Sequence, residues 1–131
     1  MREIKFRGKT YENEWVYGSF IDAGSKKFIW NRYPIEVDPK TVGLFTDFYD
    51  AKKKPIYEGD LVISAIFKEG PVYLVAYSKY EGWIRKLYKI KNYEPAFTIA
   101  DPSENYMVIG NIHDNPELYF NRLYKSKSHQ R

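Results

Sequence analysis

Residues 54–63, with the sequence KPIYEGDLVI, constrain the fold more than any other stretch of the chain. Pro55 fixes its own φ and pushes the residue before it toward extended geometry. Glu58, Gly59 and Asp60 form a turn pattern, because glycine readily takes positive φ and aspartate accepts hydrogen bonds from nearby amides. Residues 61–67 then form an apolar run, which predicts a strand without a solvated face. A structural turn that leads into a buried strand indicates a β-rich fold.

Short runs of β-forming residues, separated by turn residues, recur along the whole chain. They predict strands at residues 4–7, 15–21, 27–30, 41–46, 61–67, 72–77, 83–90, 97–99 and 106–112. Residues 31–40 contain two prolines and are expected to form an extended connection. The spacing of about 10–12 residues between the middle strands is typical of a small barrel or rolled antiparallel sheet. We therefore expect a mostly-β fold.

A short helix is expected near the C-terminal end. Asn115 as the cap, Pro116 at the first helical position and Glu117 in the first turn predict a helix over residues 116–123. Residues 124–131 lack apolar anchors and are expected to be a frayed basic tail. A chain of 131 residues fits one domain, which we place at residues 1–118.

Charge and composition exclude several classes of protein. Residues 119–131 hold four of the 21 basic residues and none of the 17 acidic ones, so the rest of the chain is neutral. The sequence has no cysteine, which excludes disulfides, thiolate metal sites and a cysteine nucleophile. No apolar run is long enough for a membrane span or a signal peptide, so we expect a cytoplasmic protein without membrane contact.

Patterns that would indicate catalysis or metal binding are weak. His129 lies in the expected tail, and His113 has Asp114 only as its chain neighbour, whose side chain usually points elsewhere. Two carboxylate pairs, Asp47 with Asp50 and Glu58 with Asp60, are better explained by turns. We therefore expect no catalytic residue, no metal site and no cofactor. An enzyme with an unrecognised carboxylate site is kept as an alternative.

Residues 79–93 interleave cations with aromatic rings, as surfaces that stack bases and neutralise phosphates do. In a strand, Trp83 and Arg85 would share one face and Lys86 would lie on the other, so neither face is purely basic. An edge strand whose lysines prevent pairing with another sheet is the structural alternative. The candidate binding surface in this segment comprises Lys79, Tyr80, Trp83, Arg85, Lys86 and Lys89.

Three segments in a fixed order carry a family resemblance: residues 1–7 (MREIKFR), residues 41–46 and 56–62 (TVGLFT and IYEGDLV), and residues 108–118 (VIGNIHDNPEL). In this order and spacing they resemble the YopX family of phage and prophage proteins, over residues 1–118. The chain departs from the family pattern at residues 50–54, where members often carry Asp, Asn and Gly. The resemblance implies a barrel-like, mostly-β fold with added short α+β elements, and a phage or prophage origin. It implies no chemistry.

These observations favour a non-catalytic accessory protein that binds another protein of the phage or the host, in the cytoplasm of the bacterial host. A nucleic-acid-binding module that uses residues 79–93 is the first alternative, although a neutral body disfavours it. The identity of a partner and the oligomeric state are left open by the sequence.

Overall fold

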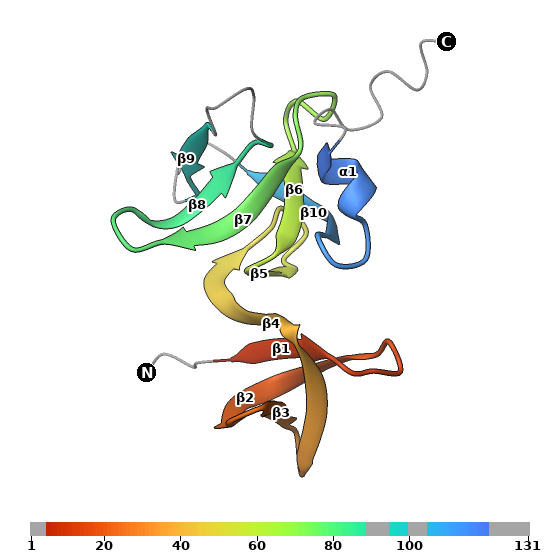
Figure 1. Cartoon of the computed structure of the whole chain (residues 1–131). Helices are drawn as coiled ribbons and strands as arrows, with labels where there is room; N and C mark the ends of the chain where they lie inside the picture. The colour runs from red at the N-terminus through yellow and green to blue at the C-terminus, as the bar shows by residue number, and fades with distance from the viewer. Residues whose placement is uncertain (1–4, 89–94, 100–104, 121–131) are drawn as a thin grey trace. The chain divides into compact units, whose positions relative to one another are not determined.

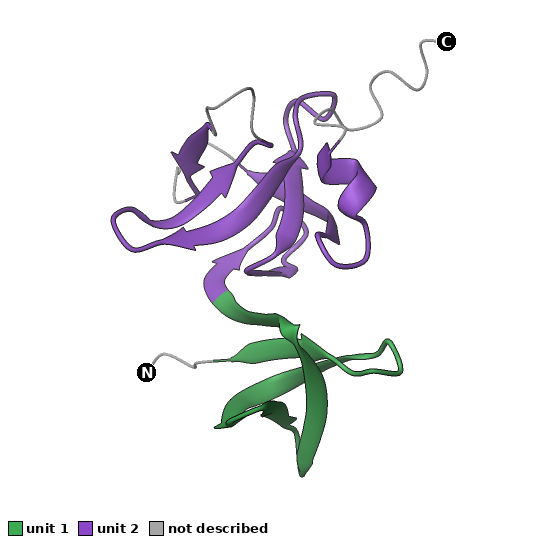
Figure 2. Ribbon diagram, viewed as in Figure 1, with its two compact units in different colours: residues 1–45 green, residues 46–131 purple. Residues whose placement is uncertain are grey.

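A computed structural model of the chain describes residues 5–88, 95–99 and 105–120. These residues form ten strands and one short helix, which confirms the expected mostly-β fold (Figure 1). The chain divides into two compact units, residues 1–45 and residues 46–131 (Figure 2). The expected tail at residues 124–131 and the last part of the expected helix lie outside the described residues.

Unit 1 is a closed four-stranded antiparallel barrel. It consists of β1 (Phe6–Lys9), β2 (Trp15–Ala23), β3 (Lys26–Trp30) and the first part of β4 (Pro34–Tyr49). Consecutive strands pair with each other, and β1 also pairs with β4, which closes the barrel. Ile29 and Val37 are completely buried inside it, and the rings of Phe6 and Phe20 pack with their centroids 5.3 Å apart.

Closure of so small a barrel requires a residue without a side chain on β2. A Cβ atom at Gly18 would overlap the backbone carbonyl oxygen of Trp30 on the neighbouring strand. Because backbone cannot move aside as a flexible side chain can, only glycine fits at this position. Gly18 therefore lets β2 and β3 approach closely enough to enclose the core.

The expectation of an extended connection at residues 31–40 was wrong over most of its length, because β4 starts at Pro34 and runs without interruption to Tyr49. Proline is tolerated there for two reasons. Pro34 is the first residue of the strand, and Pro39 lies where the pairing with β1 changes register, so its missing N–H breaks no regular ladder bond. The Thr41 hydroxyl stabilises this irregular stretch by accepting from the Lys9 N–H and donating to the Asp38 carbonyl.

Unit 2 is built on a five-stranded antiparallel sheet in the order β10-β6-β7-β8-β9. Its elements are β5 (Pro55–Tyr57), β6 (Asp60–Ser64), β7 (Tyr73–Ser78), β8 (Gly82–Lys86), β9 (Ala96–Thr98), β10 (Tyr106–Asn111) and α1 (Pro116–Phe120). β5 pairs with β4. On β6, Val62 packs into one apolar cluster and its neighbours Leu61 and Ile63 pack into another. Both faces of β6 are therefore buried, as its apolar sequence predicts.

The turn between β5 and β6 has the geometry that its residue types favour. Gly59 has a φ of 94°, in the region that glycine occupies without strain. The Asp60 carboxylate is buried and accepts a hydrogen bond of 2.8 Å from the Tyr57 N–H. The Gly59 N–H donates to the Val75 carbonyl, and the Ile112 N–H donates to the Gly59 carbonyl. One turn thus connects β7 with the segment that follows β10.

Several strand ends, and the helix cap, differ from the prediction. β6 ends at Ser64 rather than at residue 67, because the Ser64 hydroxyl accepts from the N–H groups of Ile66 and Phe67 and turns the chain. β8 ends at Lys86 rather than at the expected residue 90. Residues 87 and 88 are not part of the strand, and residues 89 and 90 lie outside the described residues. Asn115 does not act through its side chain as the expected helix cap, because that side chain accepts from the Asn111 N–H instead.

Replacement of Gly59 by valine should lower the free energy of unfolding by about 1 kcal/mol or more, since a β-branched residue is strained at positive φ. Chemical denaturation of the two proteins measures this difference. Gly24→Val is the matched control for backbone strain alone: its φ is 80°, but it lies in an exposed hairpin turn. An unchanged denaturation midpoint for Gly59→Val would contradict the prediction.

Candidate binding surface

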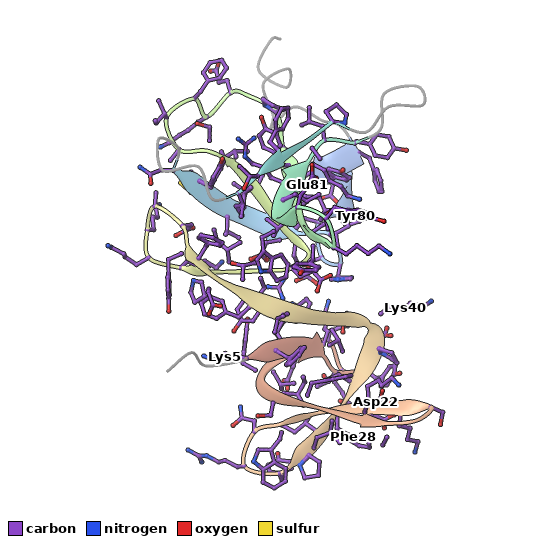
Figure 3. All side chains as sticks on the ribbon, turned by 90° about the vertical axis from the view of Figure 1, so that its left-hand side faces the viewer. Lys5, Asp22, Phe28, Lys40, Tyr80 and Glu81 are labelled. Atoms are coloured by element: carbon purple, nitrogen blue, oxygen red, sulfur yellow. The ribbon has the colours of Figure 1, made fainter. Side chains whose placement is uncertain are left out.

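The first two candidate residues of the 79–93 segment lie in the exposed turn between β7 and β8. Tyr80 is 87% exposed, and the Lys79 ammonium lies 5.4 Å from the centre of its ring. The turn, whose Tyr80 and Glu81 are labelled in Figure 3, is fixed by the Ser78 hydroxyl, which accepts from the N–H groups of both residues. Lys79 and Tyr80 form one small cationic and aromatic tip.

Trp83 and Arg85 face the core of unit 2. The Trp83 ring packs edge-on against Tyr77, 5.1 Å between centroids, and against the apolar cluster around Val62. The Arg85 guanidinium lies among three aromatic rings, 4.6 Å from Tyr73, 4.9 Å from Tyr106 and 5.1 Å from Phe97. These ring contacts stabilise a cation whose Nε is buried without a hydrogen bond. Both residues serve the packing of unit 2.

Lys86 is half-buried and, by the alternation of a strand, lies on the opposite face from Arg85. Lys89 lies outside the described residues. The structure therefore brings Lys79 and Tyr80 together in one exposed turn. Trp83 and Arg85 pack within unit 2 instead, and Lys86 lies on the opposite face of β8 from them. The alternation rule had already placed Trp83 with Arg85, but it could not say that their common face is the inner one.

The buried carboxylates hold backbone groups. Oδ1 of Asp50 accepts from the N–H groups of Lys52 and Lys54, each at 2.8 Å, and shapes the turn in which Lys53 has a φ of 70°. Oδ2 of Asp50 accepts from the Val108 N–H at 3.1 Å and thereby ties the turn to β10. This is the segment where the chain departs from the family pattern. The hydrogen bonds that Asp50 accepts from Lys52 and Lys54 fit an Asx-type turn, which local sequence can specify. The hydrogen bond that it accepts from Val108 joins residues 58 positions apart.

Within the described ranges, no three His, Asp or Glu side chains are grouped closely enough for a metal ion. Nor does any helix in the described part of the chain have the length and apolar character that crossing a membrane requires.

The sequence analysis missed two exposed apolar side chains that follow β6. Ile66 is 73% exposed and Phe67 is 65% exposed. They were assigned to the buried strand because the apolar run continues through them. The signal that could have found them is Ser64, a residue that often bonds the backbone N–H groups after it, followed closely by the polar run from Lys68 to Gly70.

The fold defines a class, a small β protein that joins a closed four-stranded barrel to an antiparallel five-stranded sheet. A family model described as YopX protein matches residues 2–119. The chain belongs to the YopX family, which confirms the resemblance drawn from its three sequence segments. None of the curated proteins compared with the chain matches it.

Asp50→Asn should destabilise the protein by about 1–3 kcal/mol, since an amide cannot accept all the backbone hydrogen bonds that both carboxylate oxygens accept. Asp47→Asn is the matched control, because Asp47 is exposed and its φ of 72° is one that asparagine tolerates. Urea denaturation of both variants gives the comparison. Equal effects of the two substitutions would show that the bonds of Asp50 add no stability.

Proposed function

We propose that this YopX-family protein is a non-catalytic binding module, a phage or prophage accessory protein that captures a protein partner in the cytoplasm of the bacterial host. The observation that carries the proposal is the exposed pair Ile66 and Phe67 in unit 2. Large apolar side chains held in water mark interaction sites when the backbone that presents them is ordered.

The backbone that presents this pair is fixed by several hydrogen bonds. The Ser64 hydroxyl accepts from the Ile66 N–H at 3.2 Å and from the Phe67 N–H at 3.0 Å. The Ala65 N–H donates to the Asn105 carbonyl at 2.8 Å, and the Gly70 N–H donates to the Phe67 carbonyl at 3.1 Å. Because both ends of the turn are tied down, Ile66 and Phe67 are presented at a defined place. Little conformational entropy is then lost when a partner covers them.

The chemistry around the pair resembles the anatomy of a protein interface. Lys68 and Glu69 follow directly and are exposed, so a charged rim borders the apolar side chains. Burial of an apolar side chain of this size contributes about 1.5–3 kcal/mol. Two such anchors can therefore dominate the affinity of a modest interface. The buried carboxylates of Asp50 and Asp60 support the non-catalytic part of the proposal, since their oxygens bind backbone N–H groups.

A double variant, Ile66→Ser with Phe67→Ser, should lose at least about 30-fold in affinity for the partner, the effect of removing an anchor worth about 2 kcal/mol. The partner is first identified by a photo-crosslinking amino acid placed at position 67 of the full chain in phage-infected cells. It is then purified and titrated against each variant. The denaturation midpoint should stay unchanged, because both side chains are already in water.

Tyr80→Ser is the matched control, as Tyr80 is an even more exposed aromatic residue on another turn of the same unit. It should leave the affinity unchanged. Full affinity of the double variant would contradict the proposal. So would crosslinking that is as strong from position 80 as from position 67, because that result indicates unspecific contact.

A further inference from the structure

A second exposed surface lies in unit 1, on the outer side of the hairpin formed by β2 and β3. In the observed register Ser19 is opposite Trp30, Ile21 is opposite Phe28, and Ala23 is opposite Lys26. Residues that are directly opposite share a face of the sheet. The other face is the inside of the barrel, where Ile29 is completely buried. We define the barrel face as Tyr17, Ser19, Ile21, Lys26, Phe28 and Trp30.

Two rings of the barrel face are open to solvent. Trp30 is 48% exposed and Tyr17 is 42% exposed. They are diagonal neighbours across the two strands, so both rings border the same part of the barrel face. Ser19, which is directly opposite Trp30, is exposed and has a small side chain. Trp30 therefore presents an aromatic surface of the kind on which a base stacks.

Cations flank these rings. Lys26 lies on the barrel face itself, and Arg32 lies in the turn directly after Trp30. Both are exposed and make no ion pair within the described ranges. On the β1 side, Arg7 and Lys9 lie over the ring of Trp15, at 4.7 Å and 5.9 Å from its centre. Arg7 is buried against Trp15, so the exposed positive charge beside the rings comes from Lys26 and Arg32.

Two acidic groups also lie near this face. Asp22, labelled in Figure 3, binds the Lys27 ammonium at 2.6 Å. This hydrogen bond and that from the Gly24 N–H lower the pKa of the Asp22 carboxyl, so it stays ionised and paired. Glu36 is opposite Phe28 on β4 and is the acid that faces the rings from that strand.

We propose that the barrel face binds single-stranded nucleic acid, with a base stacked on Trp30 and phosphates at Lys26 and Arg32. Exposed rings and unpaired cations on one sheet face are the combination by which single strands are held without sequence preference. A protein partner would use the apolar rings but would leave Lys26 and Arg32 without a role. This function goes beyond the partner capture proposed for Ile66 and Phe67, and it lies in the other unit.

The test is fluorescence anisotropy of labelled single-stranded DNA and RNA of one sequence, titrated with full-length protein from low to physiological salt. Trp30→Ala should weaken binding by about 5- to 150-fold, the range for loss of one stacked base. Lys26→Ala with Arg32→Ala should reduce the slope of log affinity against log salt by about 1.4, since each phosphate contact on a single strand contributes about 0.7. The DNA and RNA arms show which sugar is preferred.

Two further variants keep the proposal falsifiable. Ser19→Glu places a negative charge directly opposite Trp30 on the barrel face and not in the core, and it should abolish binding even if Trp30→Ala does not fold. Tyr80→Ala removes an exposed ring from unit 2 and should leave binding unchanged. Absence of binding at physiological salt would overturn the proposal. Binding that survives both Trp30→Ala and Ser19→Glu would overturn it as well, because the basic end of the chain would then supply the affinity.

Discussion

Burial of β6 on both faces is the constraint on which the structure of unit 2 depends. Leu61, Val62 and Ile63 are all completely buried, and consecutive residues of a strand point to opposite sides. Each side must therefore be covered. One cluster does so with Ile56 and Val75, and the other with Val72 and Tyr119 of α1. The five-residue helix is thus held by packing on the sheet, since a helix of this length has little stability of its own.

Buried polar groups connect the elements of unit 2 more specifically than the apolar contacts do. Asp50 joins the turn after β4 to β10, and Gly59 joins the turn before β6 to β7 and to Ile112. Arg85 is stabilised by three aromatic rings instead of a carboxylate. A rigid frame of this kind allows apolar side chains to be presented in water at fixed positions, which is what the proposed surface at Ile66 and Phe67 requires.

The type of most elements could be predicted from the sequence, but β5 was not predicted, and the ends of the strands were predicted less well. The turn at Gly59, the buried strand that follows it and a short helix starting at Pro116 were all predictable from local residue types. The end of β6 was not, because Ile66 and Phe67 continue the apolar pattern while the Ser64 hydroxyl turns the backbone. The 79–93 segment showed the same difficulty: its composition suggested a surface, but Trp83 and Arg85 pack toward the core.

The sequence by itself determined the family, the mostly-β class and the local conformation of the turns, since these depend on neighbouring residues and on composition. Only the tertiary structure decided which face of each strand is inside. That choice depends on pairings between distant segments, such as β1 with β4 and Asp50 with Val108. Barrel closure at Gly18 then leaves Tyr17 and Trp30 outside, because residues on a strand alternate and their neighbours fill the core. The alternation of residues in the sequence predicts that each strand has two faces. The pairing of distant strands decides which of the two is exposed to solvent.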